Sequence, residues 1–189
     1  MLTVNIYRGR WEHKNKYTED LIAYLFRLGP QERRLDAMEV FAADELMKEP
    51  SLGQLVRQFT SALRAAILGD PLSGLQYVLQ TALPQHPRVR EFAKAHYELL
   101  FPRWAVICDR IATAYALGLR PGVTWLDVAL LFNMIIEGCV VRARVETVQP
   151  TLSTGESLEA GAIIALLPSL LDIPPGKSVD SLYIVDHSF

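Results

Sequence analysis

The feature that most limits how this chain can fold is the spacing of its apolar residues, which recur every three or four positions along most of its length. Such spacing places apolar side chains on one face of an α-helix, whereas a half-buried strand needs alternation at every second residue. Half of the 189 residues are apolar, so helices of this kind can enclose a sizeable core. The sequence therefore predicts a folded, all-α protein and argues against intrinsic disorder.

Capping and helix-breaking residues divide the pattern into segments. Thr18, Ser51 and Thr124 are suitable N-caps, and Pro102 predicts a kink or break within the longest segment. The predicted helices cover residues 18–28, 30–48, 51–68, 72–83, 88–117, 125–147 and 156–171. We expect a single helical bundle at residues 18–171, preceded by an appendage at 1–17 and followed by an extended tail at 172–189.

The helices predicted at 125–147 and 156–171 are the most apolar in the chain. A helix with apolar residues on nearly every side must be covered by protein, so each lies in the centre of the fold or against a partner subunit. Asn133 and Glu137 interrupt the longest apolar run, Val128–Val141, so we expect neither export nor a membrane span.

Charge and cysteine usage narrow the class of protein. The net charge of −2 argues against a protein that coats nucleic acid, but residues 1–17 hold four basic residues and one acidic residue. That basic end suits either a DNA-contacting fragment or a solvated terminus. Cys108 and Cys139 lie in apolar helical segments, which favours core packing over redox sensing and makes a reducing cytoplasm the expected compartment.

The sequence lacks the patterns that catalysis would need. Its four histidines are dispersed, and no two of them have the i, i+4 spacing of a helical zinc site. Neither a Gly-rich phosphate loop nor a Gly-x-Ser-x-Gly elbow occurs. We therefore expect a protein that is not an enzyme and that has no metal and no cofactor.

The segment Trp11-Glu12-His13-Lys14, followed by Tyr17 and Leu21, resembles the end of the DNA-binding head of TetR-type transcriptional regulators. The resemblance implies that Trp11 and Lys14 contact DNA phosphate, where a lysine at a helix start adds its charge to free backbone N–H groups. In the family about three dozen residues of helix-turn-helix precede this point, whereas ten residues precede Trp11 here. The expected DNA-reading head is thus incomplete, and DNA is a partner only where a complete head is present.

The second half of the chain resembles the TetR-type sensing domain in the order of its motifs: His86-Pro87-Arg88, then Trp104, Leu119-Arg120-Pro121-Gly122 and Ile136-Glu137-Gly138. The resemblance implies a homodimer in which the last two long helices form a four-helix bundle with those of a second copy. The residues expected at this dimer interface are Ile135, Gly138, Gly161 and Ile164.

A ligand pocket is expected between the segments 88–117 and 125–147, since these concentrate large aromatic residues with few polar ones. Ordinary core packing is the alternative for each residue, and Asn133 and Glu137 could instead pair across a dimer with Arg142. The candidate ligand-binding residues are Tyr97, Trp104, Cys108, Phe132, Asn133 and Glu137.

These observations predict a TetR-like transcriptional regulator whose helical domain dimerises and senses a small apolar or amphipathic ligand. Ligand binding would change the spacing of two DNA-binding heads. The alternative is a stand-alone helical dimer that binds a ligand or acts as an adaptor without binding DNA.

Overall fold

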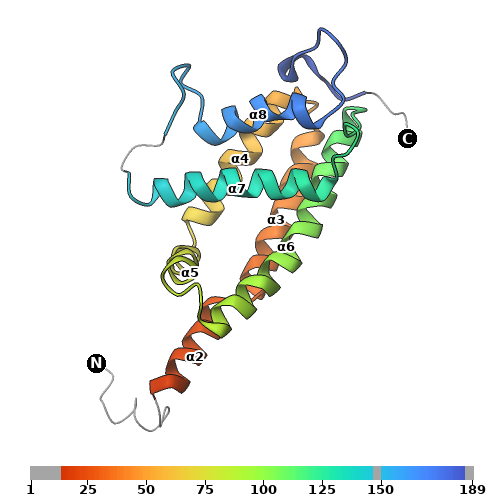
Figure 1. Cartoon of the computed structure of the whole chain (residues 1–189). Helices are drawn as coiled ribbons and strands as arrows, with labels where there is room; N and C mark the ends of the chain where they lie inside the picture. The colour runs from red at the N-terminus through yellow and green to blue at the C-terminus, as the bar shows by residue number, and fades with distance from the viewer. Residues whose placement is uncertain (1–13, 147–149, 186–189) are drawn as a thin grey trace.

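The computed structural model describes residues 14–146 and 150–185, which form helices joined by loops and contain no strand (Figure 1). The all-α prediction is confirmed for these residues. The elements in chain order are α2 (Lys14–Leu25), α3 (Gly29–Leu46), α4 (Leu52–Leu68), α5 (Pro71–Ala82), α6 (Pro87–Ala114), α7 (Trp125–Ala143), α8 (Leu158–Leu170) and the short 3₁₀ helix η1 (Val179–Ser181).

Two of the predicted helix starts form complete capping boxes. The Ser51 hydroxyl accepts a hydrogen bond from the Gln54 backbone N–H, and the Gln54 side chain accepts one from the Ser51 N–H. Thr124 and Asp127 exchange the same pair of bonds at the start of α7. Because such reciprocal bonds satisfy two otherwise unpaired donors, they fix where α4 and α7 begin.

The structure differs from the predicted helix pattern at three places. Thr18 lies inside α2, which already includes Lys14, the first described residue. Pro102 does not break α6, because its ring lies on the exposed side of the helix, where a carbonyl left without its partner can face water. Helix α8 begins at Leu158, with Ser157 as the N-cap that accepts from the Ala160 N–H.

The main core lies where α4, α6, α7 and α8 meet, in the upper half of Figure 1. Helix α7 packs along the C-terminal half of α6, and α8 lies beside α7. An isolated bridge joins Leu119, just before α7, to Leu171, just after α8, so these two helices run antiparallel. This arrangement leaves α7 with one face toward the core and one toward solvent.

A second, smaller core holds the N-terminal end of the described chain. Ile22 and Leu25 of α2, with Phe26 just after it, pack against Val89 and Phe92 near the start of α6. The rings of Phe26 and Phe92 are nearly parallel, with centroids 6.4 Å apart. Helix α2 is therefore anchored to α6 at the opposite end of that helix from the main core (Figure 1).

The segment after α8 packs back onto the bundle. Val179 and Leu182 are buried in the main core, and the Leu182 carbonyl accepts a hydrogen bond from the Leu52 N–H at 2.9 Å. Arg57 of α4 forms an ion pair with Asp180. The described part of the predicted extended tail therefore covers the start of α4. The prolines and the glycine of this segment did not indicate such packing.

Candidate ligand-binding site

A cavity of about 90 Å³ lies inside the main core, enclosed by α4, α6, α7 and α8. Nearly all of its lining is apolar. Leu55 and Phe59 border it from α4, Trp104 from α6, Phe132 from α7 and Ile163 from α8. It is smaller than the roughly 150 Å³ apolar cavity that binds benzene in an engineered protein, so a ligand the size of one aromatic ring fits when the walls move outward.

Helical periodicity explains why these side chains converge. On α6, Trp104 and Cys108 lie one turn apart, and on α7 the same holds for Val128 and Phe132, so each pair faces the same way. The rings of Phe59 and Trp104 meet edge to face with centroids 5.9 Å apart. Aromatic contacts of this kind stabilise the packing of α4 against α6.

A polar compartment of about 40 Å³ adjoins the apolar cavity. Its polar lining comes from α3, α5, α6 and α7, and it shares four wall residues with the apolar cavity: Leu63, Trp104, Asn133 and Ile136. The polar side chains that border it include Gln31, Arg34, Ser73, Gln76, His96 and Glu137. The molecule therefore holds an apolar space and a polar space side by side.

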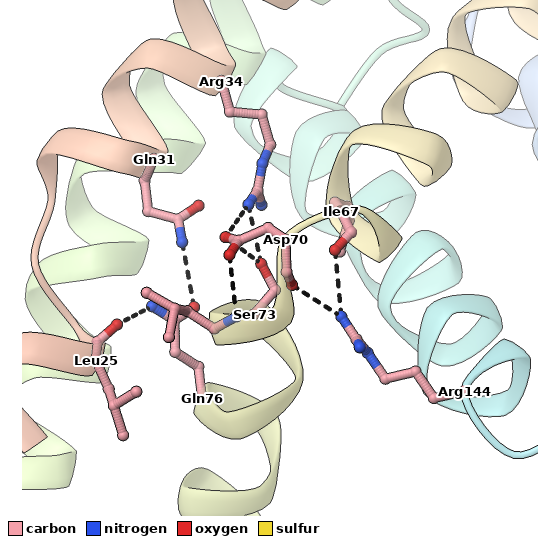
Figure 2. Close-up of polar contacts among 9 residues, drawn as sticks. Leu25, Gln31, Arg34, Ile67, Asp70, Ser73, Gln76 and Arg144 are labelled. Atoms are coloured by element: carbon pink, nitrogen blue, oxygen red, sulfur yellow. Dashed lines mark hydrogen bonds and ion pairs between the residues drawn. The ribbon is translucent and has the colours of Figure 1, made fainter. Parts of the chain in front are cut away.

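Most of the polar groups on the α3 and α5 walls are already paired, as Figure 2 shows. The Arg34 guanidinium donates to Asp70 at 2.7 Å and to the Ser73 hydroxyl at 2.9 Å. Gln31 donates to the Gln76 side-chain oxygen at 3.2 Å, and the Gln76 amide nitrogen donates to the Leu25 carbonyl. Burial lowers the pKa of Arg34, and the charge of Asp70 opposes that shift.

Asp70 joins three parts of the fold. Its carboxylate caps α5 by accepting from the Leu72 N–H at 3.0 Å, in addition to holding Arg34. Arg144, at the end of α7, donates to the backbone carbonyls of Ile67 and Asp70 (Figure 2). The junction of α4 and α5 is thus tied both to α3 and to α7.

Glu137 has its hydrogen-bond partners within the chain. Its side chain bonds to Asn133 and Tyr77, and the Tyr97 hydroxyl lies 3.4 Å from its Oε1. Burial raises the pKa of Glu137, and the three hydrogen bonds oppose that rise. Arg142, considered as a partner across a dimer, forms an ion pair with Glu146 at 2.7 Å in its own chain.

His96 differs from its neighbours because its Nδ1 is buried without a hydrogen-bond partner among the described residues. The residue is only 8% exposed. Burial lowers the pKa of His96 to about 4, with a smaller contribution from the charge of Arg34, so the imidazole is neutral near pH 7. A neutral imidazole offers one donor and one acceptor, and one of these is unused here.

The structure brings most of the predicted pocket residues together. Trp104, Cys108, Phe132 and Asn133 border the apolar cavity, whereas Glu137 borders the polar compartment. The remaining candidate, Tyr97, contacts Glu137 but lines neither space. Sequence reasoning missed the polar wall from α3 and α5, because its contact between Gln31 and Gln76 joins residues 45 positions apart and no motif marks it.

The predicted dimer-interface residues fall into two groups. Gly138 is exposed, and a Cβ built there would meet nothing within 4 Å. Ile135 and Ile164 are half-buried against the main core, and Gly161 is buried beneath the Leu152 side chain. Of the residues expected at DNA, Trp11 lies outside the described residues, as does the side chain of Lys14.

Within residues 14–146 and 150–185 there is neither a candidate membrane span nor a candidate metal cluster. None of the helices is long and apolar enough to cross a membrane. No group of three or more His, Cys, Asp or Glu side chains in that part of the chain could hold a metal ion.

Comparisons with protein-family models, with curated proteins and with solved structures found no match for this chain. The resemblance to TetR-type regulators therefore depends on the motifs quoted from the sequence. It stays a hypothesis about function.

Proposed function

We propose that this chain is the sensing and dimerising part of a TetR-type transcriptional regulator, and that it binds a small ligand in the cavity between α4, α6, α7 and α8. The observation that carries the proposal is the apolar cavity itself, which lies between the two segments where the sequence placed a pocket. An enclosed apolar space with few polar groups is the usual form of a small-molecule site.

The groups around this site favour binding over catalysis. Burial raises the pKa of the Cys108 thiol to about 12, so its reactive thiolate is scarce near neutral pH. The imidazole of His96 is neutral, and its Nδ1 has no partner among the described residues. An acid–base pair or an activated nucleophile would need the opposite arrangement.

A route for the response to the ligand runs through α4. Leu63 borders both spaces, and Ile67, one turn further along α4, accepts from Arg144. The helix ends next to Asp70, whose ion pair with Arg34 reaches α3. A ligand that displaces α4 would therefore act on α3 and on α5, whose Gln76 donates to the Leu25 carbonyl at the end of α2.

The exposed face of α7 supports pairing with a second copy. Leu126, Leu130, Met134 and Val141 are between 42% and 60% exposed and, together with Gly138, lie on one stripe of the helix. The exposed charged side chains of α7 are confined to the two ends of the helix, at Asp127 and Arg142, and Gly138 lies toward the C-terminal end of the stripe. The stripe is therefore complementary to itself, as the identical surfaces of a two-fold dimer must be.

The dimer is tested with two matched substitutions. Met134→Asp places a carboxylate in the stripe, whereas Met47→Asp makes the same change at the end of α3, where the methionine is 84% exposed. Sedimentation should find a dimer for the wild type and for Met47→Asp, and a monomer for Met134→Asp. A monomeric wild type, or a Met134→Asp variant that stays dimeric, would contradict this part of the proposal.

The ligand site is tested with two compounds of similar size, toluene and benzoate. At a tenfold excess over its dissociation constant, a bound ligand stabilises the folded state by about 1.4 kcal/mol, which corresponds to a Tm increase of roughly 3–6 °C in a protein of this length. Toluene should raise Tm, whereas benzoate should not, because its carboxylate would be buried without a partner. Equal responses to both compounds, or no response to toluene, would show that the cavity is not a ligand site.

A further inference from the structure

The polar compartment beside the apolar cavity limits the chemistry of the ligand, and this inference rests on the proposed function. The two spaces share the walls formed by Leu63, Trp104, Asn133 and Ile136, so a ligand in the apolar cavity has only these side chains between it and the polar groups. At about 40 Å³ the compartment exceeds the roughly 10–15 Å³ needed by one water-sized group. It accommodates a polar substituent of one or two heavy atoms and nothing much larger.

Charged substituents do not suit this compartment. Its cation, Arg34, is already held by Asp70 and Ser73, so an anionic substituent would find no free positive charge and would lie near the Asp70 carboxylate. A cationic substituent would need a free carboxylate, but Glu137 is held by three hydrogen-bonding side chains. Burying an unpaired charge costs far more than burying a neutral polar group, so the substituent is neutral.

The group that remains available is the imidazole of His96. His96 borders the compartment, and its Nδ1 is buried and lacks a hydrogen-bond partner in the described part of the chain. Depending on the tautomer, Nδ1 either donates or accepts one hydrogen bond. A hydroxyl group can serve both cases, because it carries a donor as well as acceptor lone pairs, whereas a ketone or an ether can only accept.

We propose that the ligand is amphipathic and carries a hydroxyl group, which enters the polar compartment and hydrogen-bonds His96 Nδ1 while its apolar body occupies the neighbouring cavity. The ligand thereby supplies the partner that this buried imidazole lacks. A phenol or a short aliphatic alcohol has the required combination of size, neutrality and polarity.

The test compares phenol with toluene, which has nearly the same shape but carries a methyl group in place of the hydroxyl. Dissociation constants for the full chain are measured by NMR chemical-shift titration. By apolar transfer alone toluene would bind more tightly, since its methyl group favours leaving water. Recognition of the hydroxyl predicts the reverse order, with phenol the tighter ligand.

Two variants locate the source of that preference. His96→Phe keeps an aromatic ring but removes the hydrogen bond, and should shift the ratio of the two dissociation constants about tenfold toward toluene. His86→Phe is the matched control, because His86 lies at the N-cap of α6 and borders neither space, so the ratio should stay as in the wild type. Should His96→Phe fail to fold, the imidazole ¹⁵N resonances of wild-type His96 must respond to phenol and not to toluene.

The outcomes separate this inference from the proposed function. A wild type that prefers toluene, or a preference for phenol that His96→Phe leaves unchanged, overturns the hydroxyl assignment and leaves the apolar site in place. If neither compound binds, the ligand site and the hydroxyl assignment both fail.

Discussion

Filling the apolar cavity from within should make the protein more stable and unable to bind a ligand. Ala129 of α7 is 2% exposed and borders the cavity, so Ala129→Leu adds three carbon atoms beside the free space. Empty space in a core costs about 24 cal/mol per Å³, which gives about 2 kcal/mol for a cavity of about 90 Å³. Because one leucine fills only part of that volume, we expect a gain of about 1 kcal/mol and a Tm increase of roughly 2–4 °C.

The assay combines urea unfolding with toluene titration for the wild type, Ala129→Leu and the control variant Ala66→Leu. Ala66 is exposed on α4 and borders no described cavity, so the control should change the free energy of unfolding by less than about 0.5 kcal/mol and leave toluene binding intact. Ala129→Leu should abolish toluene binding. A variant that loses stability through overpacking, yet binds toluene as the wild type does, would refute the reasoning.

Three further predictions concern the polar groups and the N-terminus. Asp70→Ala removes both the N-cap of α5 and the ion-pair partner of Arg34, so it should lower the free energy of unfolding in urea by about 2–3 kcal/mol. The exposed control Asp44→Ala should change it little. Equal losses would contradict the assigned role of Asp70. The pKa of Glu137 is raised in the folded state, so the folded wild type binds more protons than the unfolded chain and loses stability as pH rises above the ordinary value of 4.5. Glu137→Gln lacks this loss, so its Tm relative to the wild type should increase from pH 4 to pH 7. Parallel Tm curves for the two proteins would contradict the assignment. The present chain should bind duplex DNA at physiological salt only weakly and without sequence preference, because its net charge is −2 and its basic residues within 1–17 would contact phosphates. Sub-micromolar affinity for one sequence over scrambled controls would contradict this expectation.

Local signals in the sequence predicted the fold class and the positions of most helices. Ser51 and Thr124 fix helix starts through contacts within three residues of sequence, so a reader of the sequence can recognise them. The sequence could not show whether Pro102 breaks its helix. That depends on whether the proline faces solvent, which is determined by how the helices pack. The buried positions of Val179 and Leu182 likewise depend on contacts with α4, more than a hundred residues away.

The candidate site was predictable where one helix face determines it. Trp104, Cys108, Phe132 and Asn133 lie on the inner faces of α6 and α7, and helical periodicity places them there. The polar compartment was not predictable, because its polar groups come from separate helices and pair only after those helices pack. Gln31 and Gln76, which are 45 positions apart, hydrogen-bond to each other, and no pattern in the sequence marks that contact.

The proposed function requires that the space between α4, α6, α7 and α8 be an apolar cavity able to take up an apolar ligand. A crystal structure of the protein under xenon pressure tests it most directly, because xenon enters dry apolar cavities without needing any polar partner. We expect xenon density bordered by Trp104, Ala129 and Phe132. A core in which side chains fill this space, with xenon bound only elsewhere or not at all, would contradict it.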